Sequence, residues 1–268
     1  MLGREAVIAI GGGVGPMAGV ALHAGIIEAT RTDRGDQSHL RVIHHSDSPA
    51  IPDRSAYLAL PAAERRRRLS PGTAMAGVFA AMARALAAGE PAVGGIPCNT
   101  FHVPEIFDEF QAEMAADRNP IRVLDMLEET LGLLRERLAG QTGLNIGVLA
   151  TGGTRRSGVY DRLLERAGQR ISQVDEADQP RLHDVIYNNK WGLKAVSPPS
   201  VRAVAAAEDF AGQLIGRGAA ALILGCTELP LALPGTLFRG VPLIDPVRAL
   251  ARALVREAAP GKLKALEP

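Results

Sequence analysis

The feature that most constrains the fold of this 268-residue chain is that its two halves follow the same succession of segments. The first half opens with an apolar run at residues 6–10, which leads into the glycine-rich loop 11–16 and a helical stretch. A later apolar run in this half ends at Cys98. The second half repeats the order from residue 145, and its later apolar run ends at Cys226. Two cysteines at matching places indicate a duplicated fold rather than two accidental core residues.

The alternation of segments indicates the fold class. Apolar runs rich in β-forming residues alternate with Ala- and Leu-rich stretches, which is typical of parallel βα units. The predicted strands are 6–10, 40–44, 92–96, 121–124, 145–149, 220–224 and a short one near Leu243. The predicted helices are 16–31, 74–88, 103–116, 126–138, 158–166, 179–187, 199–216 and 247–257. Gly89 and Gly218 are predicted to end helices. We expect an α/β protein with two pseudo-symmetric, doubly wound parallel sheets.

Composition excludes several classes of function. The 30 basic and 29 acidic side chains leave a net charge of +1, which gives no reason to expect nucleic acid or a membrane surface as partner. The first apolar run is too short for a signal peptide, and no stretch approaches the roughly 18 apolar residues of a membrane helix. Two cysteines are no disulfide framework. We expect a cytoplasmic protein.

Three conspicuous motifs are not interpreted as binding sites for a charged partner, a metal ion or a nucleotide. The charge run 64–68 is expected to be a solvated helix face. His44 and His45 lack partners at metal-ligand spacing, so no metal site is predicted. The loop 11–16 lacks the lysine and the glycine spacing of nucleotide-binding loops. We expect it to line a small-molecule site instead, because such sites lie beyond the carboxyl ends of parallel strands.

Both cysteines fall where a strand is expected to end and a helix to begin. Asn99 and Thr100 follow Cys98, and Thr227 follows Cys226; all three are of the types that cap helices. A thiol at a helix N-terminus is expected to have a lowered pKa. A thiolate can remove the α-proton of an amino acid while an opposed thiol returns a proton to the other face. Donors beside the thiols would stabilise the charge that develops on the substrate carboxylate.

Five short motifs in order resemble the aspartate/glutamate racemase superfamily, and most closely its branch of aspartate racemases and broad-specificity amino-acid racemases. The matching stretches run from residue 7 to about 230 and read Gly12-Gly-Val-Gly-Pro16, Ile51-Pro-Asp-Arg54, Pro97-Cys-Asn-Thr100 with His102, Ala150-Thr-Gly-Gly-Thr154 with Ser157-Gly-Val-Tyr160, and Gly225-Cys-Thr-Glu228. The resemblance implies a racemase that needs no pyridoxal phosphate or other cofactor. It also implies two α/β domains with the active site in the cleft between them.

The resemblance assigns domains and site residues. The first domain is expected to comprise residues 1–118 and 242–268, and the second residues 119–241. The catalytic residues would be Cys98 and Cys226. Substrate-binding residues would come from the two loops and from the residues that follow the cysteines, namely Gly13, Thr151, Asn99, Thr100 and Thr227. The family expectation for assembly is a homodimer.

Two cations are expected to bind an acidic substrate. By the resemblance, Arg54 grips the side-chain carboxylate, which a guanidinium matches with two parallel hydrogen bonds. Aspartate racemases also place a lysine near the substrate. Lys190 and Lys194 are both candidates, and we favour Lys194. Three departures from the family pattern touch this region, at Ala18-Gly19, in the low bulk of the strand before Cys98, and in the long loop around Trp191.

The predicted function is therefore racemisation of a small acidic amino acid, aspartate or glutamate, by proton transfer between Cys98 and Cys226. The same fold could instead serve a cis–trans isomerase or a decarboxylase of a small dicarboxylate, each of which needs one cysteine. A non-catalytic amino-acid binding protein would need neither thiol. A dithiol redox protein would place its cysteines close together in the sequence. The presence of both thiols favours racemisation.

Overall fold

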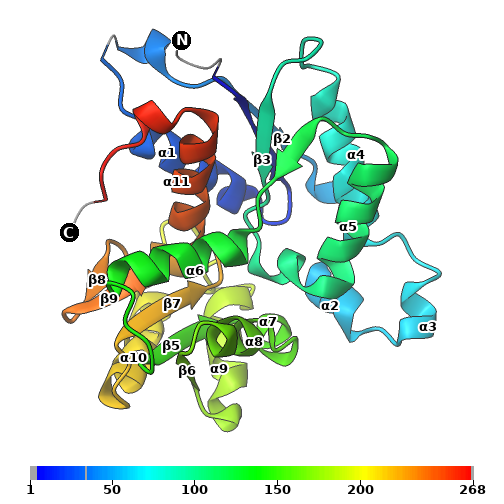
Figure 1. Ribbon diagram of the computed structural model, residues 1–268. Coiled ribbons are helices and arrows are strands. Elements are labelled where there is room, and N and C mark those ends of the chain that lie inside the picture. The colour runs from blue at the N-terminus through cyan, green and yellow to red at the C-terminus, as the bar shows by residue number, and fades with distance from the viewer. Residues whose placement is uncertain (1–4, 34, 267–268) are drawn as a thin grey trace. The chain divides into compact units, whose positions relative to one another are not determined.

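The computed structural model describes residues 5–33 and 35–266 (Figure 1). The chain forms two compact units, Met1–Glu129 with Val247–Pro268 as unit 1, and Thr130–Pro246 as unit 2. Each unit is built around one sheet in which the long neighbouring strands are parallel. The predicted α/β class with two parallel sheets is confirmed. Among the described residues, no helix is both long and apolar enough to span a membrane.

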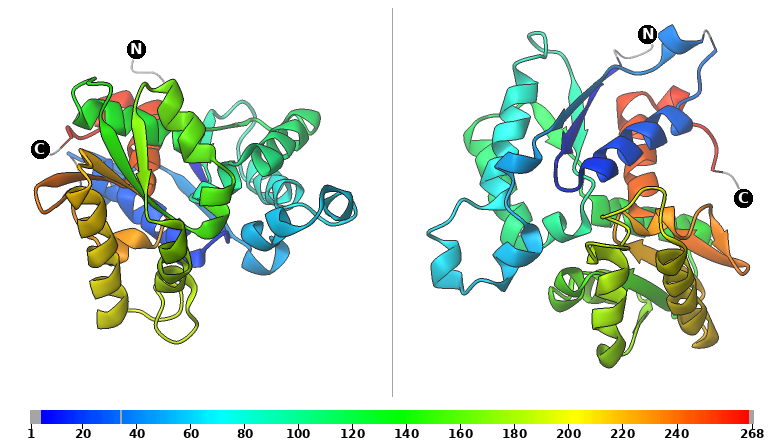
Figure 2. Two further views of the ribbon diagram at one scale, coloured as in Figure 1. Left: turned by 90° about the horizontal axis from the view of Figure 1, so that it is seen from below. Right: turned by 180° about the vertical axis from the view of Figure 1, so that it is seen from behind.

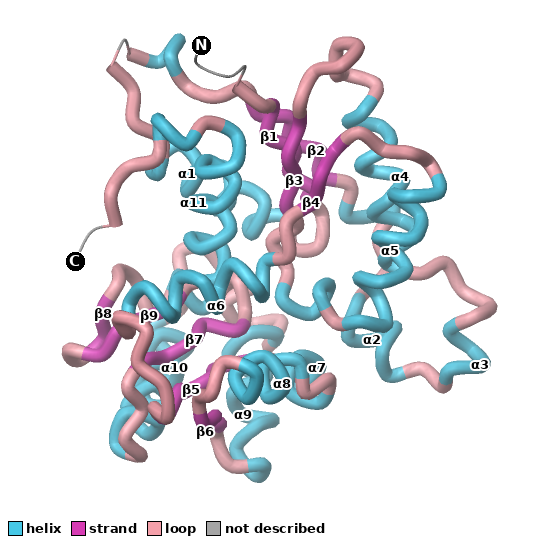
Figure 3. Tube along the Cα trace, viewed as in Figure 1, coloured by secondary structure: helices cyan, strands magenta, loops and turns pink. Residues whose placement is uncertain are grey.

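Unit 1 contains a four-stranded sheet in the order β2-β1-β3-β4 (Figure 3). Its strands are β1 (Val7–Gly12), β2 (Val42–Ser46), β3 (Ala92–Gly95) and β4 (Ile121–Val123). All three pairings are parallel. The central strand β1 is buried along its whole length, as expected of a strand that is covered on both faces. The carboxyl ends of β1 and β3 lie side by side, because Ile10 pairs with Gly95.

Helices cover both faces of the unit 1 sheet. On one face, α1 (Pro16–Ala29) and α11 (Pro246–Ala258) lie side by side and pack against the sheet (Figures 1 and 2). The other face carries α4 (Pro71–Ala83) and α5 (Pro104–Ala116), whose aromatic side chains pack edge to face. The glycines of β3 permit close packing from both sides. A Cβ atom on Gly94 would lie 2.6 Å from Phe79, and one on Gly95 would lie 3.0 Å from Leu250.

Unit 2 repeats this arrangement with one additional strand. The sheet order is β6-β5-β7-β9-β8. Its strands are β5 (Asn145–Ala150), β6 (Arg170–Gln173), β7 (Ala221–Gly225), β8 (Leu237–Phe238) and β9 (Val241–Ile244). All pairings are parallel except that of β8 with β9. β5 therefore corresponds to β1 and β7 to β3. This correspondence agrees with the duplication predicted from sequence.

The helices of unit 2 also lie on both faces of its sheet. On one face, α9 (Gln179–Tyr187) and α10 (Val201–Gly216) share a core with Leu149, Leu222 and Leu224. α8 (Val159–Arg166) lies on the opposite face, where a Cβ on Gly225 would be 3.2 Å from Tyr160. The short α7 (Gly152–Arg156) follows β5 directly, and α6 (Met126–Arg137) contains the point where the two units meet in the sequence.

Short polar elements were not predicted. The missed elements are β6, β8, α7, α2 (Arg54–Ala59) and α3 (Ala62–Arg65). None has an apolar stripe long enough to show periodicity. The run 64–68 was expected to form a solvated helix face. Four of its five residues are exposed, but only Glu64 and Arg65 belong to a helix, the short α3, and the others form a turn and a bend. Gly218 follows the end of α10 with φ +82°, as predicted, whereas Gly89 lies in a turn beyond the end of α4.

The predicted domain boundaries assign two strands differently from the sheets. β4 pairs with β3 and extends the unit 1 sheet, although it follows the predicted boundary at 118/119. β9 pairs with β7 in unit 2, whereas residues 242–268 were expected to return to the first domain. Sequence order alone does not reveal which sheet a short edge strand joins, because such a strand can pair with the sheet of either unit.

Gly13 is the position where the fold tolerates a side chain least. Its φ of +94° disfavours L residues, and a Cβ would lie 2.8 Å from backbone atoms of Asp47. We expect Gly13→Ala to lower the free energy of unfolding by about 1–3 kcal/mol. The matched control is Gly77→Ala, at an exposed position of α4 where no atom lies within 4 Å of the added Cβ. It should raise stability by up to about 1 kcal/mol. Equal effects in chemical denaturation would contradict this account.

Candidate active site

In unit 1, two loops leave neighbouring strands at the same edge of the sheet. Gly13 follows β1 and Cys98 follows β3. Because Ile10 pairs with Gly95, Gly13 and Cys98 stand the same number of residues beyond a paired position. The thiol of Cys98 is partly exposed. The structure therefore brings the glycine-rich loop and the first cysteine to one sheet edge, where small-molecule sites of parallel sheets lie.

The residues that follow Cys98 are buried but do not cap a long helix. Asn99 and Thr100 lie in the single 3₁₀ turn η3 (Asn99–His102), and both side chains are buried. α5 begins only at Pro104, with Val103 as its N-cap residue. The expected capping role of Asn99 and Thr100 was therefore wrong. Pro104 occupies the first helical turn, where proline is favoured because no N–H donor is needed there.

His102 anchors this turn to the rest of unit 1. Its buried ring places Nε2 3.1 Å from the carbonyl oxygen of Ile96, and Nδ1 lies 3.3 Å from the Asp125 carboxylate. Burial raises the pKa of Asp125, but the hydrogen bonds and charge from His102 and nearby backbone N–H groups outweigh it, so that the net pKa is lowered. His102 therefore ties the end of its own turn back to Ile96, at the start of the segment that carries Cys98, and also to Asp125.

Arg54 is held against the glycine-rich loop. It is the first residue of α2, which Asp53 caps by accepting a hydrogen bond from the Ala56 N–H at 2.7 Å. The guanidinium donates to the carbonyl oxygen of Val14 and, at 3.2 Å, to that of Pro52. The structure thus brings two predicted substrate-binding residues, Arg54 and Gly13, to adjoining parts of unit 1.

In unit 2, the corresponding loops also leave adjacent strands. Ala150 pairs with Gly225, so Thr151 and Cys226 are the next residues beyond a paired position. The buried Thr151 caps α7, and its Oγ1 accepts a hydrogen bond of 3.2 Å from the Thr154 N–H. Thr151 therefore fixes the start of α7, directly after the strand β5 that pairs with the strand leading to Cys226.

A network of charged and polar side chains surrounds Cys226. The thiol donates to Glu228 Oε2 at 3.0 Å, and the Thr227 hydroxyl donates to the same oxygen at 3.1 Å. The ammonium of Lys194 donates to Oε1 of the same carboxylate. Lys194 Nζ also lies 5.4 Å from the centre of the Tyr187 ring, within cation–π range. Cys226 is 7% exposed and Glu228 4%, so the thiol and the carboxylate are shielded from water, while Lys194 is partly exposed.

Burial and charge shift the pKa of every ionisable member of this network. The pKa of the Cys226 thiol is raised, first by burial and then by the negative charge of Glu228, against the opposing charge of Lys194. Burial also raises the pKa of Glu228, but Lys194 and three hydrogen bonds outweigh it and lower the net value. For Lys194, burial lowers the pKa, while Cys226 and Glu228 raise it by more. Glu228 and Lys194 therefore form an ion pair in which the carboxylate is buried and the lysine side chain is 26% exposed.

The expectation of a lowered thiol pKa was wrong for Cys226. Only the 3₁₀ turn η5 (Leu229–Leu231) follows it, and a single turn supplies little dipole. The structure distinguishes the two lysine candidates, because the Lys194 ammonium donates to the Glu228 carboxylate, whereas Lys190 donates through its backbone N–H to Asn188 Oδ1. Sequence analysis missed Glu228 as a site residue. The signal was its position two residues after the cysteine, where a carboxylate is costly to bury without a partner.

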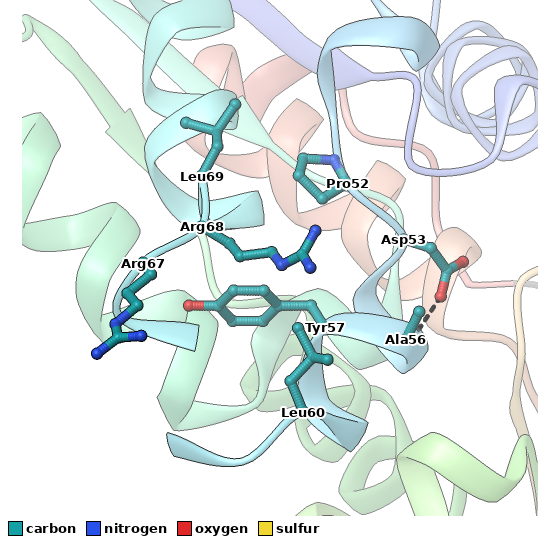
Figure 4. Close-up of a pocket in the computed structure, with 8 residues that line it drawn as sticks. All are labelled: Pro52, Asp53, Ala56, Tyr57, Leu60, Arg67, Arg68 and Leu69. Atoms are coloured by element: carbon teal, nitrogen blue, oxygen red, sulfur yellow. Dashed lines mark hydrogen bonds between the residues drawn. The ribbon is translucent and has the colours of Figure 1, made fainter. Parts of the chain in front are cut away.

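One cavity of unit 1 lies beside Arg54 but includes neither cysteine. Its volume is about 640 Å³, and it is lined by residues of α2 and of the charge run, namely Pro52, Asp53, Ala56, Tyr57, Leu60, Arg67, Arg68 and Leu69. Figure 4 shows the Arg68 side chain extending between Pro52 and the Tyr57 ring. Across the part of the chain that the structure describes, no three His, Cys, Asp or Glu side chains are grouped to hold a metal ion.

A family model identifies the chain. The model of the Asp/Glu/Hydantoin racemase family matches residues 12–254, which include both cysteines and nearly all of the sheet strands. The chain belongs to this family. Racemases are isomerases, so membership of this family makes the protein an isomerase.

Solved structures of racemases have the same fold. An aspartate racemase from Picrophilus torridus is 26% identical, with 98% of this chain and 96% of that chain covered and a TM-score of 0.74. An aspartate racemase homologue from Pyrococcus horikoshii is 19% identical, with 95% and 99% covered and a TM-score of 0.66. A glutamate racemase from Francisella tularensis, in complex with D-glutamate, is 16% identical, with 100% and 86% covered and a TM-score of 0.55.

The ion pair of Lys194 with Glu228 leads to a prediction about the free energy of unfolding. Lys194→Met would leave the Glu228 carboxylate buried without its cation, which costs about 3–5 kcal/mol for a fully buried pair and less here, because Lys194 is 26% exposed. We expect a loss of about 2–4 kcal/mol in the free energy of unfolding at neutral pH. Lys190→Met, in the same loop but exposed, should change it by less than about 0.5 kcal/mol.

The difference between wild type and Lys194→Met should depend on pH. Because the folded-state pKa of Glu228 is lowered, its contribution to stability is present above the unfolded pKa and is lost as pH falls through the folded value. The gap between the two proteins should therefore be large at neutral pH and shrink in acid. Urea denaturation at several pH values measures it. A gap that stays constant into acid would show that Lys194 contributes packing rather than charge.

Proposed function

We propose that this protein is a cofactor-independent racemase of a small acidic amino acid, with Cys98 and Cys226 as its two acid/base groups. The observation that carries the proposal is the placement of the thiols. Each follows the strand that pairs in parallel with the first strand of its unit, β3 with β1 and β7 with β5, and the two sheets have corresponding strand orders. In a member of a racemase family, equivalent thiols in two equivalent units match the need for one base and one acid on opposite faces of a carbon.

The proposed reaction moves one proton off and another onto the α-carbon. A thiolate removes the α-proton, so the C–H bond breaks and its electron pair passes toward the substrate carboxylate. The opposite thiol then gives its proton to the other face of the carbon and becomes a thiolate. General acid–base transfer of this kind contributes about 10²–10⁴-fold. The reverse direction uses the same two groups with their roles exchanged.

The weak acidity of the α-carbon requires stabilisation of the charge on the carboxylate. Asn99 and Thr100 follow Cys98 directly and can donate hydrogen bonds to that charge. Thr227, beside Cys226, can do so once its hydroxyl leaves Glu228 Oε2. Preorganised donors of this kind contribute about 3–4 kcal/mol each in well-built sites. The burial of Asn99 and Thr100 supports this role, because buried side chains are held in place before substrate binds.

The cations on the two sheet edges support an acidic substrate. Arg54 is fixed at the glycine-rich loop, and Lys194 lies beside Cys226. A guanidinium fork suits a carboxylate geometrically, and aspartate and glutamate each carry a second carboxylate for it. We therefore propose aspartate or glutamate as substrate. An isomerase or decarboxylase of a dicarboxylate would need only one of the two thiols, so the second would be unexplained.

The single-cysteine variants test this proposal. Purified, reduced wild type should interconvert the enantiomers of aspartate or glutamate without added cofactor. Cys98→Ala and Cys226→Ala should each lower kcat by at least about 10²-fold, because each removes one of two obligatory proton carriers. Chiral chromatography of the products measures this loss, and circular dichroism checks the fold of each variant.

Two results would contradict the proposal. Racemisation that persists in either variant would show that one thiol suffices or that neither takes part. Absence of racemisation of every amino acid by wild type, together with conversion of an unsaturated dicarboxylate or a malonate, would favour the isomerase or decarboxylase.

A further inference from the structure

The carboxylate of Glu228 is the common acceptor of the groups around Cys226. Its two oxygens receive hydrogen bonds from the Cys226 thiol, the Thr227 hydroxyl and the Lys194 ammonium. A buried carboxylate is retained only when donors or cations compensate for its lost hydration. Here the compensation comes from the residues proposed to act on the substrate, so Glu228 is tied to the site as well as to the stability of unit 2.

We propose that Glu228 is the positioning residue of Cys226, holding its thiol protonated and in one orientation so that Cys226 enters turnover as the proton donor. This inference rests on the proposed function. Glu228 has no need to touch the substrate, because its effect passes through the sulfur atom. The Sγ–H bond is aimed at Oε2 by a hydrogen bond of 3.0 Å, which fixes both the proton and the rotamer.

The charges within unit 2 support this assignment. The ionisable groups that act on the Cys226 thiol there are Glu228 and Lys194, while Tyr187 faces the lysine. Negative Glu228 opposes formation of a second negative charge on sulfur, and burial opposes it further. Positive Lys194 favours the thiolate but is already paired with Glu228. The thiol therefore keeps its proton until a substrate carbanion takes it.

The proposal fixes the order of events in the first turnover. The Cys98 thiolate removes the α-proton and becomes a thiol, while the C–H electron pair passes toward the substrate carboxylate. The Cys226 Sγ–H then turns from Glu228 Oε2 toward the α-carbon, and its bond breaks as the proton passes to the opposite face. A thiolate then remains on Cys226 beside Glu228. Lys194, whose ammonium contacts the same carboxylate, supplies the positive charge that offsets it. The next turnover in the opposite direction, or exchange with solvent, returns the proton to sulfur.

A thiol titration tests the proposal without relying on activity. The chain has two cysteines, so Cys98→Ala leaves Cys226 as the only thiol. The ultraviolet absorbance of the thiolate is followed against pH in Cys98→Ala and in Cys98→Ala/Glu228→Gln, over the range in which circular dichroism shows no unfolding. Glutamine keeps an acceptor oxygen and the shape of the side chain but loses the charge. We expect the thiolate to form at a lower pH in the glutamine variant.

Two further variants keep the test decisive if Glu228→Gln alone folds poorly. Cys98→Ala/Glu228→Gln/Lys194→Met removes the ion pair as a unit and should titrate below Cys98→Ala, because the charge of Glu228 acts more strongly on the thiol than that of Lys194. Cys98→Ala/Asp175→Asn removes a carboxylate from an exposed ion pair of the same unit, with Arg217, and should leave the titration unchanged. Equal titration of Cys98→Ala and both Glu228 variants would overturn the proposal.

Activity supplies a second, independent readout. In Glu228→Gln with both cysteines present, the alkaline limb of the kcat/KM profile should move to lower pH in parallel with the thiol titration, and kcat should fall about 10–100-fold. Loss of activity with an unmoved pH profile would show a structural role only and overturn the positioning role. A titration shift in a protein that racemises nothing would support the coupling of Glu228 to Cys226 and overturn the proposed function alone.

Discussion

Parallel pairing of adjacent strands is the constraint on which both halves of the candidate site depend. β3 pairs with β1 and β7 with β5, so each cysteine lies at the same sheet edge as the loop that follows the first strand of its unit. Glycines allow this packing where a side chain would collide with a neighbour. Gly94 and Gly95 admit Phe79 and Leu250 from opposite faces of the first sheet. A small change in either sheet would therefore move a thiol relative to its loop.

The two cysteines occupy different environments despite their equivalent places in the fold. Cys98 is partly exposed and is held through a turn that His102 anchors. Cys226 is buried and bonded to Glu228, which is paired with Lys194. Duplication therefore conserved the position of the thiol in the sheet, while the surrounding side chains diverged. Such asymmetry suits a reaction in which one group begins as base and the other as acid.

Much of the fold was predictable because its long elements have clear apolar periodicity. The eight predicted helices and the main strands appear with ends shifted by a few residues. Elements such as β6, α3 and α7 were missed, because short polar segments are stabilised by tertiary contacts and leave no periodic pattern. The sheet that β4 and β9 join was also not predictable, since strand pairing depends on contacts between segments distant in sequence.

The candidate site, like the fold, was predictable only in part from the sequence. Motifs led to the prediction of both cysteines and of Lys194 as site residues, but they did not reveal that Glu228 contacts Cys226 and Lys194. The direction of the Cys226 pKa shift was predicted wrongly, because the argument considered the helix dipole and not burial or a neighbouring carboxylate. Effects of this kind require the positions of side chains, which spacing along the chain does not supply.

The central claim is that two different groups handle the proton on the two faces of the α-carbon. The most direct test incubates wild type with L-aspartate in deuterated water and follows the earliest D-aspartate by mass spectrometry. The account predicts that this product carries deuterium at the α-carbon while the remaining L-aspartate still carries protium. Early D-aspartate that retains protium would contradict it, because a single group would then have returned the proton that it removed.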